Sequence, residues 1–145
     1  MFSTHFLQLL VPCAVGNPDG HWILCCVDLL KQNVCIYDPL YKKTKISIRR
    51  KQIAPLLHFI PSILQCSRYF QQKSILPNGK VFVVQQSIPK KLPAQLDDDS
   101  CGVFICRYTD ILMRHKCFWG WGTKNVPGFR EEMALEIFAN NVALD

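Results

Sequence analysis

The sequence predicts an α+β fold, in which a small mixed or antiparallel-leaning sheet is flanked by helices. Two observations lead to this class. Short apolar runs rich in β-branched and aromatic residues, separated by turn residues, fill the first part of the chain. Later segments carry apolar residues at helical spacing. A chain of 145 residues can build one core, so residues 1–145 are expected to form a single domain.

The strand predictions follow from apolar runs and the turn residues that bound them. The expected strands are residues 6–12, 21–30, 34–37 and 81–86. Pro12 is expected to end the first strand, and Asn17-Pro18-Asp19-Gly20 is a strong turn sequence. A tight polar connection, Lys31-Gln32-Asn33, predicts that the second and third strands form a hairpin.

The helix predictions rest on apolar spacing and on proline positions. Residues 48–66 have helical spacing interrupted by Pro55 and Pro61, which predicts two short helices or a broken one. A further helix is expected at residues 101–115. A final helix is expected at residues 129–142, with Glu131 and Glu132 in its first turn, where the helix dipole favours acids.

Composition and charge limit the classes of function. The chain is 49% hydrophobic and 19% charged, as expected for a folded globular protein, and no run approaches the ~18 apolar residues that span a membrane. The net charge is +6, with a basic cluster between residues 42 and 51 and a smaller one at Lys90 and Lys91. Such a cluster can face an acidic protein, bind nucleic acid or remain solvated. No aromatic and basic interleaving supports nucleic acid, which is not expected as a partner.

The eight cysteines are expected to be reduced thiols. None forms a Cys-x-x-Cys pair, so a structural zinc site is not predicted, and no other metal or cofactor is implied. Residues 6–15 are apolar but lack the basic flank of a signal peptide, which favours an intracellular protein, in the nucleus or the cytoplasm. Seven cysteines are expected to be packing residues, and Cys101 is the exception.

Cys101 stands where an acidic loop changes into a helix. Residues 95–100 are polar and acidic, and the apolar helical spacing starts directly after Cys101-Gly102. A thiolate in the first turn of a helix is stabilised by unpaired backbone N–H groups and by the helix dipole. Gly102 leaves room for a substrate backbone. These features predict that Cys101 is a nucleophile.

His21, Asp38 and Gln95 are the expected partners of this nucleophile. His21 opens one strand of the predicted hairpin and Asp38 follows the other, 17 residues later, so the two are expected to lie close together. His21 would take the thiol proton and Asp38 would orient the ring, with the Cys101 sulfur within about 4 Å of a ring nitrogen. Gln95, six residues before Cys101, could donate its amide N–H to the oxyanion.

In this arrangement the chain resembles the ubiquitin-like-protein-specific proteases, the SUMO/sentrin-deconjugating cysteine peptidases of the adenain-like fold. That family shows His-Trp before an apolar strand, a strand ending in Tyr-Asp, and Gln followed by Cys-Gly-Val-Phe-x-Cys. The matching positions here are His21-Trp22, Tyr37-Asp38 and residues 95–106. The resemblance implies that Cys101, His21, Asp38 and Gln95 form the catalytic set.

The resemblance also implies a substrate and a way of binding it. The substrate would be a SUMO-type ubiquitin-like protein, as precursor or conjugate, cleaved after its C-terminal Gly-Gly. Trp22 would pack over the Gly-Gly tail, and Gly102 would leave room for it. Separately from the resemblance, we expect the chain to be a monomer with no membrane partner.

Three departures from the family pattern are visible. Ser100 replaces the usual Asp before the nucleophile, and Pro39 replaces the usual Ser after the triad Asp. The upstream substrate-binding region of the family, with its second tryptophan, has no counterpart in residues 1–145. We therefore expect an open groove along Trp22, a relatively exposed segment 6–12, reaction of Cys101 with small electrophiles and poor cleavage of precursors.

The sequence leaves two alternative functions open. The chain could be a binding module that keeps the fold and grips a ubiquitin-like protein without cleaving it. It could also be a basic nucleic-acid-binding domain, supported only by the cluster between residues 42 and 51.

Overall fold

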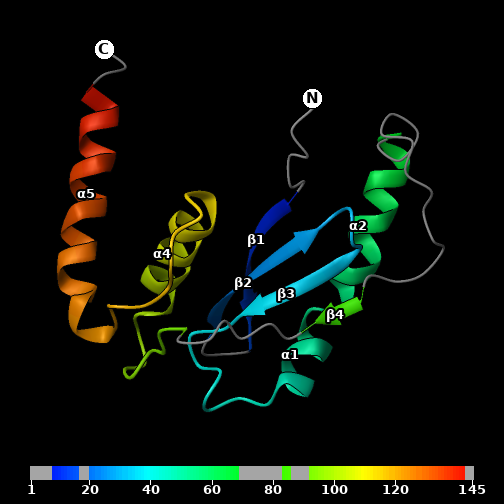
Figure 1. The fold of residues 1–145 in the computed structure, drawn as a ribbon, viewed down its shortest axis with the longest axis horizontal. Helices are drawn as coiled ribbons and strands as arrows, with labels where there is room; N and C mark the ends of the chain where they lie inside the picture. Colours follow the sequence, from blue (N-terminus) through cyan, green and yellow to red (C-terminus); the bar gives the residue numbers. More distant parts are fainter. Residues whose placement is uncertain (1–7, 17–19, 69–82, 86–91, 143–145) are drawn as a thin grey trace.

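The computed structural model describes residues 8–16, 20–68, 83–85 and 92–142 (Figure 1). Within them lies a four-stranded sheet with the order β1-β2-β3-β4. The strands are β1 Gln8–Val15, β2 His21–Asp28, β3 Asn33–Tyr37 and β4 Val83–Gln85. β2 pairs antiparallel with both β1 and β3, whereas β4 pairs parallel with β3, so the sheet is mixed. The predicted hairpin of β2 and β3 and the α+β class are confirmed.

The first strand corrects one prediction. Pro12 does not end β1, which continues to Val15 and keeps Pro12 in register with Leu24 of β2. Proline cannot donate to a ladder, but β1 stands at the edge of the described sheet, where one side of the strand has no neighbour to accept a bond. The strand is correspondingly open, with Leu9 40% exposed. Residues 6 and 7 of the predicted strand lie outside the described residues.

The central strand β2 is buried on both faces and joins two hydrophobic clusters. Ile23, Cys25 and Val27 face one cluster, while Leu24 and Cys26 face the other. This alternation is the period of two that a strand imposes. Every residue from Ile23 to Asp28 is buried, so the strand that begins with His21 is packed on both faces.

Two helices cover the first face of the sheet (Figure 1). They are α1, Ile46–Gln52, and α2, Ala54–Cys66, separated at Ile53. The predicted pair of short helices is confirmed, but only Pro55 acts as a boundary. It occupies the first turn of α2, where its missing N–H costs nothing, whereas α2 continues through Pro61.

The other face of the sheet packs against α4, Cys101–Met113. After α4 the chain forms the short 3₁₀ helix η1, Thr123–Asn125, and then α5, Val126–Val142. The start of α4 at Cys101 agrees with the prediction. The start of α5 does not, since it begins three residues early and accepts Pro127 in its first turn. Glu131 and Glu132 therefore lie beyond the first turn, which holds no acid.

The cysteines are more varied than expected. All eight are free thiols in the structure, and Cys25 and Cys26 are buried as predicted. Cys66, Cys106 and Cys117 are exposed, so these three are not packing residues. None of the helices in the described part of the chain combines the length and the apolar character needed to cross a bilayer.

Candidate active site

His21 and Asp38 meet at one end of the sheet. His21 is the first residue of β2, and Asp38 directly follows β3. Their antiparallel pairing brings the imidazole Nε2 to 2.8 Å from the Asp38 carboxylate Oδ1. Since Nε2 is engaged by the carboxylate, Nδ1 is the ring nitrogen left to exchange a proton with a thiol. The predicted proximity of these two residues is borne out by this contact.

Asp38 is only 4% exposed, yet both of its carboxylate oxygens are hydrogen-bonded. Oδ1 also accepts the backbone N–H of Leu40 at 2.8 Å, and Oδ2 accepts Nε–H of Arg49 at 2.6 Å. Burial alone would raise the pKa of Asp38, but the hydrogen bonds from His21 and Arg49 and the charge of Arg49 outweigh it and lower that pKa. Asp38 is therefore a fixed, ionised acceptor for the histidine.

This lowered pKa predicts an acid-sensitive contribution to stability. Because the folded pKa lies below the unfolded value of about 3.9, the contribution is complete above about pH 5 and is lost as the pH falls through those values. In Asp38→Asn the free energy of unfolding should depend less on pH between about 3 and 6. Urea unfolding across this range measures the effect, with the exposed Asp98→Asn as control. Equal pH dependence in Asp38→Asn and the parent protein would contradict the assignment.

Cys101 is the first residue of α4 and is 8% exposed. The helix starts immediately, with the N–H of Phe104 bonded to the Ser100 carbonyl at 3.1 Å. The backbone N–H groups of the first turn, including that of Cys101, have no partner inside the helix and can stabilise negative charge on a thiolate or an oxyanion. The contacts described above join His21 to Asp38, and the approach of the Cys101 thiol to the ring stays a prediction.

Asp97 organises the loop that leads to Cys101. Its carboxylate accepts the Ser100 N–H and hydroxyl, both at 2.9 Å, and the Asp99 N–H at 3.3 Å. Partial burial would raise the pKa of Asp97, but these bonds and one from Gln95 outweigh it and lower that pKa. Ser100, which replaces the family's usual Asp, is 3% exposed and is held by this carboxylate.

Gln95 is 2% exposed and lies between two loops. Its backbone N–H donates to the Pro39 carbonyl at 2.9 Å, tying the loop before Cys101 to the residue after Asp38. Its side-chain Nε2 donates to the Asp97 carbonyl at 2.8 Å and to the Asp97 Oδ1 at 3.1 Å. A reversed amide would place Oε1 against two acceptors, so this orientation is the favourable one.

The oxyanion role predicted for Gln95 would require an exchange of hydrogen-bond partners. One N–H must leave Asp97 for the substrate oxygen, while the buried Oε1 has no partner among the described residues. A buried oxygen without a hydrogen-bond partner is uncommon in a stable fold, and a catalytic role for Gln95 is one explanation for it.

Replacing Gln95 with alanine is expected to lower kcat about 100-fold, as the loss of one oxyanion donor does. Hydrolysis of a ubiquitin-like protein with a C-terminal fluorogenic amide measures this, and circular dichroism checks the fold. Gln65→Ala, at an exposed position on α2, is the matched control. An unchanged kcat in Gln95→Ala would assign the oxyanion to other groups.

Trp22 and Gly102 line one groove. This groove, of about 550 Å³, is mostly apolar and runs between β1, β2 and α4; its other lining residues are Pro12, Ile105, Cys106, Thr109, Asp110 and Met113. The Trp22 side chain is 43% exposed, and a Cβ added at Gly102 would meet nothing within 4 Å. A flat indole beside an open strip of backbone, next to Cys101, suits an extended peptide without large side chains.

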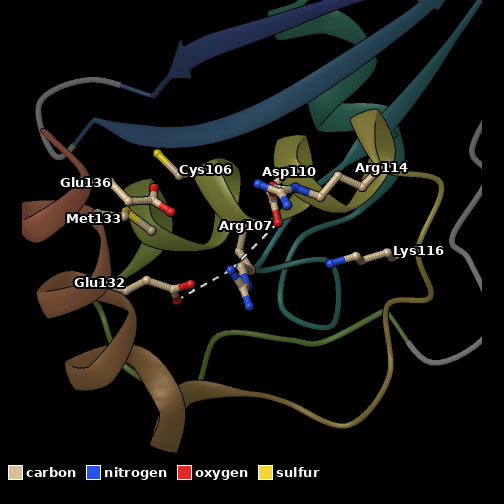
Figure 2. A pocket seen from close by; sticks show the side chains of 8 residues that line it. All are labelled: Cys106, Arg107, Asp110, Arg114, Lys116, Glu132, Met133 and Glu136. Carbon is tan, nitrogen blue, oxygen red and sulfur yellow. Dashed lines mark hydrogen bonds and ion pairs between the residues drawn. The ribbon is translucent and has the colours of Figure 1, made fainter. Parts of the chain in front are cut away.

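A second, charged pocket of about 260 Å³ lies between α4 and α5 (Figure 2). Arg107 points toward Glu132, with Nη1 3.6 Å from its carboxylate, and lies 3.7 Å from Asp110. Asp110 also pairs with Arg114. The main charges of the pocket thus offset one another, and its lining contains none of the predicted catalytic residues. No cluster of three potential metal ligands occurs in the ranges that the structure describes.

A comparison with protein families decides the identity of the chain. The model of the C-terminal catalytic domain of the Ulp1 protease family matches residues 8–143. The chain belongs to the Ulp1 protease family. It is therefore a cysteine-type peptidase specific for ubiquitin-like proteins. The match extends over every strand and helix of the described Ulp1-type domain.

Two residues of the site escaped sequence reasoning. Asp97 is one of three consecutive acids, with no local signal to single it out. Arg49 lies in the basic cluster, where nothing in its composition separates it from the other cations. Its spacing from Ile46 and Ile53 places it on the inward face of α1, and that periodicity was the available signal.

Proposed function

We propose that this Ulp1-type domain cleaves the bond after the C-terminal Gly-Gly of a SUMO-type protein, with Cys101 as nucleophile, His21 as base and Asp38 as orienting acid. The observation that carries the proposal is the 2.8 Å contact between His21 and Asp38. Trp22 and Gly102, the chain neighbours of His21 and Cys101, share one groove, which further supports it.

The first half of the reaction forms a thioester. His21 Nδ1 accepts the thiol proton, and the Cys101 sulfur attacks the carbonyl carbon of the last glycine. The carbonyl oxygen takes the electron pair and is stabilised by the Cys101 backbone N–H and by the Gln95 amide. When the carbonyl re-forms, the C–N bond breaks, and the imidazolium of His21 gives its proton to the leaving amine.

The second half releases the ubiquitin-like protein. His21, neutral again, takes a proton from water, whose oxygen attacks the thioester carbon. The C–S bond breaks, the Cys101 thiolate takes the proton back from His21, and the new C-terminal carboxylic acid loses its proton to solvent as the product leaves. Throughout the cycle Asp38 accepts the Nε2–H of His21 and so keeps the ring in one tautomer.

A covalent trap tests the proposal. A SUMO-type protein, ubiquitin and a third ubiquitin-like protein, each with a C-terminal electrophile, are incubated separately with the chain. The expected result is an adduct with the SUMO-type probe that is absent in Cys101→Ala and retained in Cys117→Ala, an exposed cysteine that lines neither pocket. Adduct formation in Cys101→Ala would refute the nucleophile, and an adduct with ubiquitin alone would refute the SUMO-type specificity.

A further inference from the structure

Arg49 differs from the cationic residues around it in being buried. Its residue exposure is 6%, whereas the other cationic side chains of its segment are exposed: Lys42, Lys43, Lys45, Arg50 and Lys51. Burying a cation is unfavourable unless it is paired and fully hydrogen-bonded. The burial of Arg49 therefore indicates that its guanidinium makes specific interactions inside the fold.

All three guanidinium nitrogens of Arg49 have partners. Nε donates to the Asp38 Oδ2 at 2.6 Å, Nη1 donates to the Gln52 Oε1 at 2.9 Å, and Nη2 donates to the Thr44 Oγ1 at 3.3 Å. Gln52 is on the same helix, and Thr44 lies just before it. The planar guanidinium is thus fixed in one orientation, which a flexible ammonium group could not reproduce.

The other carboxylate oxygen of Asp38, Oδ1, faces His21. Oδ1 accepts both the imidazole Nε2–H and the Leu40 N–H at 2.8 Å, so Arg49 on Oδ2 completes the set. With donors on both oxygens, the carboxylate cannot turn without breaking a charged hydrogen bond. Arg49, held on α1, therefore sets the orientation of the Asp38 carboxylate, and the carboxylate in turn sets the orientation of the His21 ring.

We propose that Arg49 is a positioning residue for the reaction, acting on His21 through the Asp38 carboxylate. This inference rests on the proposed function, since it assumes that His21 is the catalytic base. Arg49 holds Oδ1 toward His21, keeps Asp38 ionised in its buried site and so keeps the ring proton on Nε2. It also offsets part of the negative charge that Asp38 presents to the imidazolium.

The charge of Arg49 gives a readout that a purely structural residue would not move. The other titratable groups around the pair are Tyr108 of α4, whose pKa is raised by burial and then by the charge of Asp38, and Tyr41, whose N–H bonds the Asp38 carbonyl. Neither replaces the lost cation. Removing the positive charge leaves Asp38 uncompensated, which favours the imidazolium over the neutral base and moves the acidic limb of the pH profile upward.

The experiment compares Arg49→Gln and Arg49→Lys, with Arg50→Gln as the matched control, an exposed neighbour with the same charge change. Arg49→Gln should lower kcat about 10- to 100-fold with little change in KM, as small misplacements of catalytic groups do. Its acidic limb should move upward by about half a pH unit. Arg49→Lys should keep the limb in place but lower kcat several-fold, and Arg50→Gln should match the parent protein.

A double variant checks that the effect passes through Asp38. In an Asp38→Asn background, Arg49→Gln should add less than half of its single effect on log kcat, because the carboxylate it positions is gone. An unchanged kcat in folded Arg49→Gln, or a fully additive effect in the double variant, would overturn the inference. If Arg49→Gln does not fold, Arg49→Lys decides, since a parent-like kcat there would equally overturn it.

Failure of this inference is distinguishable from failure of the proposed function. If the covalent adduct is lost in Cys101→Ala and the Arg49 variants keep full activity, only the positioning role of Arg49 is refuted. An adduct that persists in Cys101→Ala removes the proposed mechanism, whatever the Arg49 variants show.

Discussion

Replacing His21 with alanine is expected to lower kcat/KM for a SUMO-type fluorogenic substrate by about 10⁴-fold or more, since removal of a catalytic base from a nucleophilic triad has effects of this order. The physical reason is that Nδ1 is the nitrogen left for the thiol proton, while Nε2 is engaged by Asp38 at 2.8 Å. Without the ring, Cys101 has neither a proton acceptor for attack nor a proton donor for the leaving amine. Residual activity would come from the oxyanion donors and from substrate binding.

The matched control is His58→Ala, which removes an exposed histidine on α2. It should retain the parent activity, whereas His21→Ala should bind the SUMO-type protein with an unchanged dissociation constant. A His21→Ala variant that keeps more than about a tenth of the parent kcat/KM would be incompatible with a base at this position, because general base catalysis alone contributes at least about 100-fold.

The part of the site that lies on strands could be predicted from sequence, because strand pairing is readable from local patterns. The tight Lys31-Gln32-Asn33 connection fixed the hairpin, and the hairpin brought His21 to Asp38. The start of α4 at Cys101 was likewise visible, since polar residues stop where helical apolar spacing begins.

The rest of the site depends on tertiary packing that leaves a weak trace in the sequence. Arg49 contacts Asp38 only because α1 lies against the sheet, and in the sequence it is one cation in a run of cations. The Asp97 contacts depend on a loop without periodicity. The prediction that Pro12 ends the first strand is wrong for a related reason: whether a proline ends a strand depends on whether that strand is at an edge.

The helix that carries Cys101 is held on the sheet by Phe104, and replacing Phe104 with alanine is expected to lower the free energy of unfolding by about 3–5 kcal/mol. Phe104 is fully buried, three residues after Cys101, in the cluster that includes Leu24 and Tyr108. Its ring centroid lies 5.1 Å from that of Trp121 and 6.0 Å from that of Tyr108. Alanine would leave a cavity that these rigid rings cannot collapse to fill.

Urea unfolding measures the loss, with Phe138→Ala as control because it makes the same substitution on α5 at a residue that is 69% exposed. The control should change the free energy of unfolding by no more than about 0.5 kcal/mol. A loss below about 1 kcal/mol in Phe104→Ala would show that this cluster does not hold α4, since even one buried methylene contributes about 0.8 kcal/mol. The expected loss is a large share of the roughly 5–15 kcal/mol that stabilises a domain. Activity in Phe104→Ala should therefore fall with heating well before that of Phe138→Ala, because the first turn of α4 keeps Cys101 in place only while Phe104 anchors it one turn away.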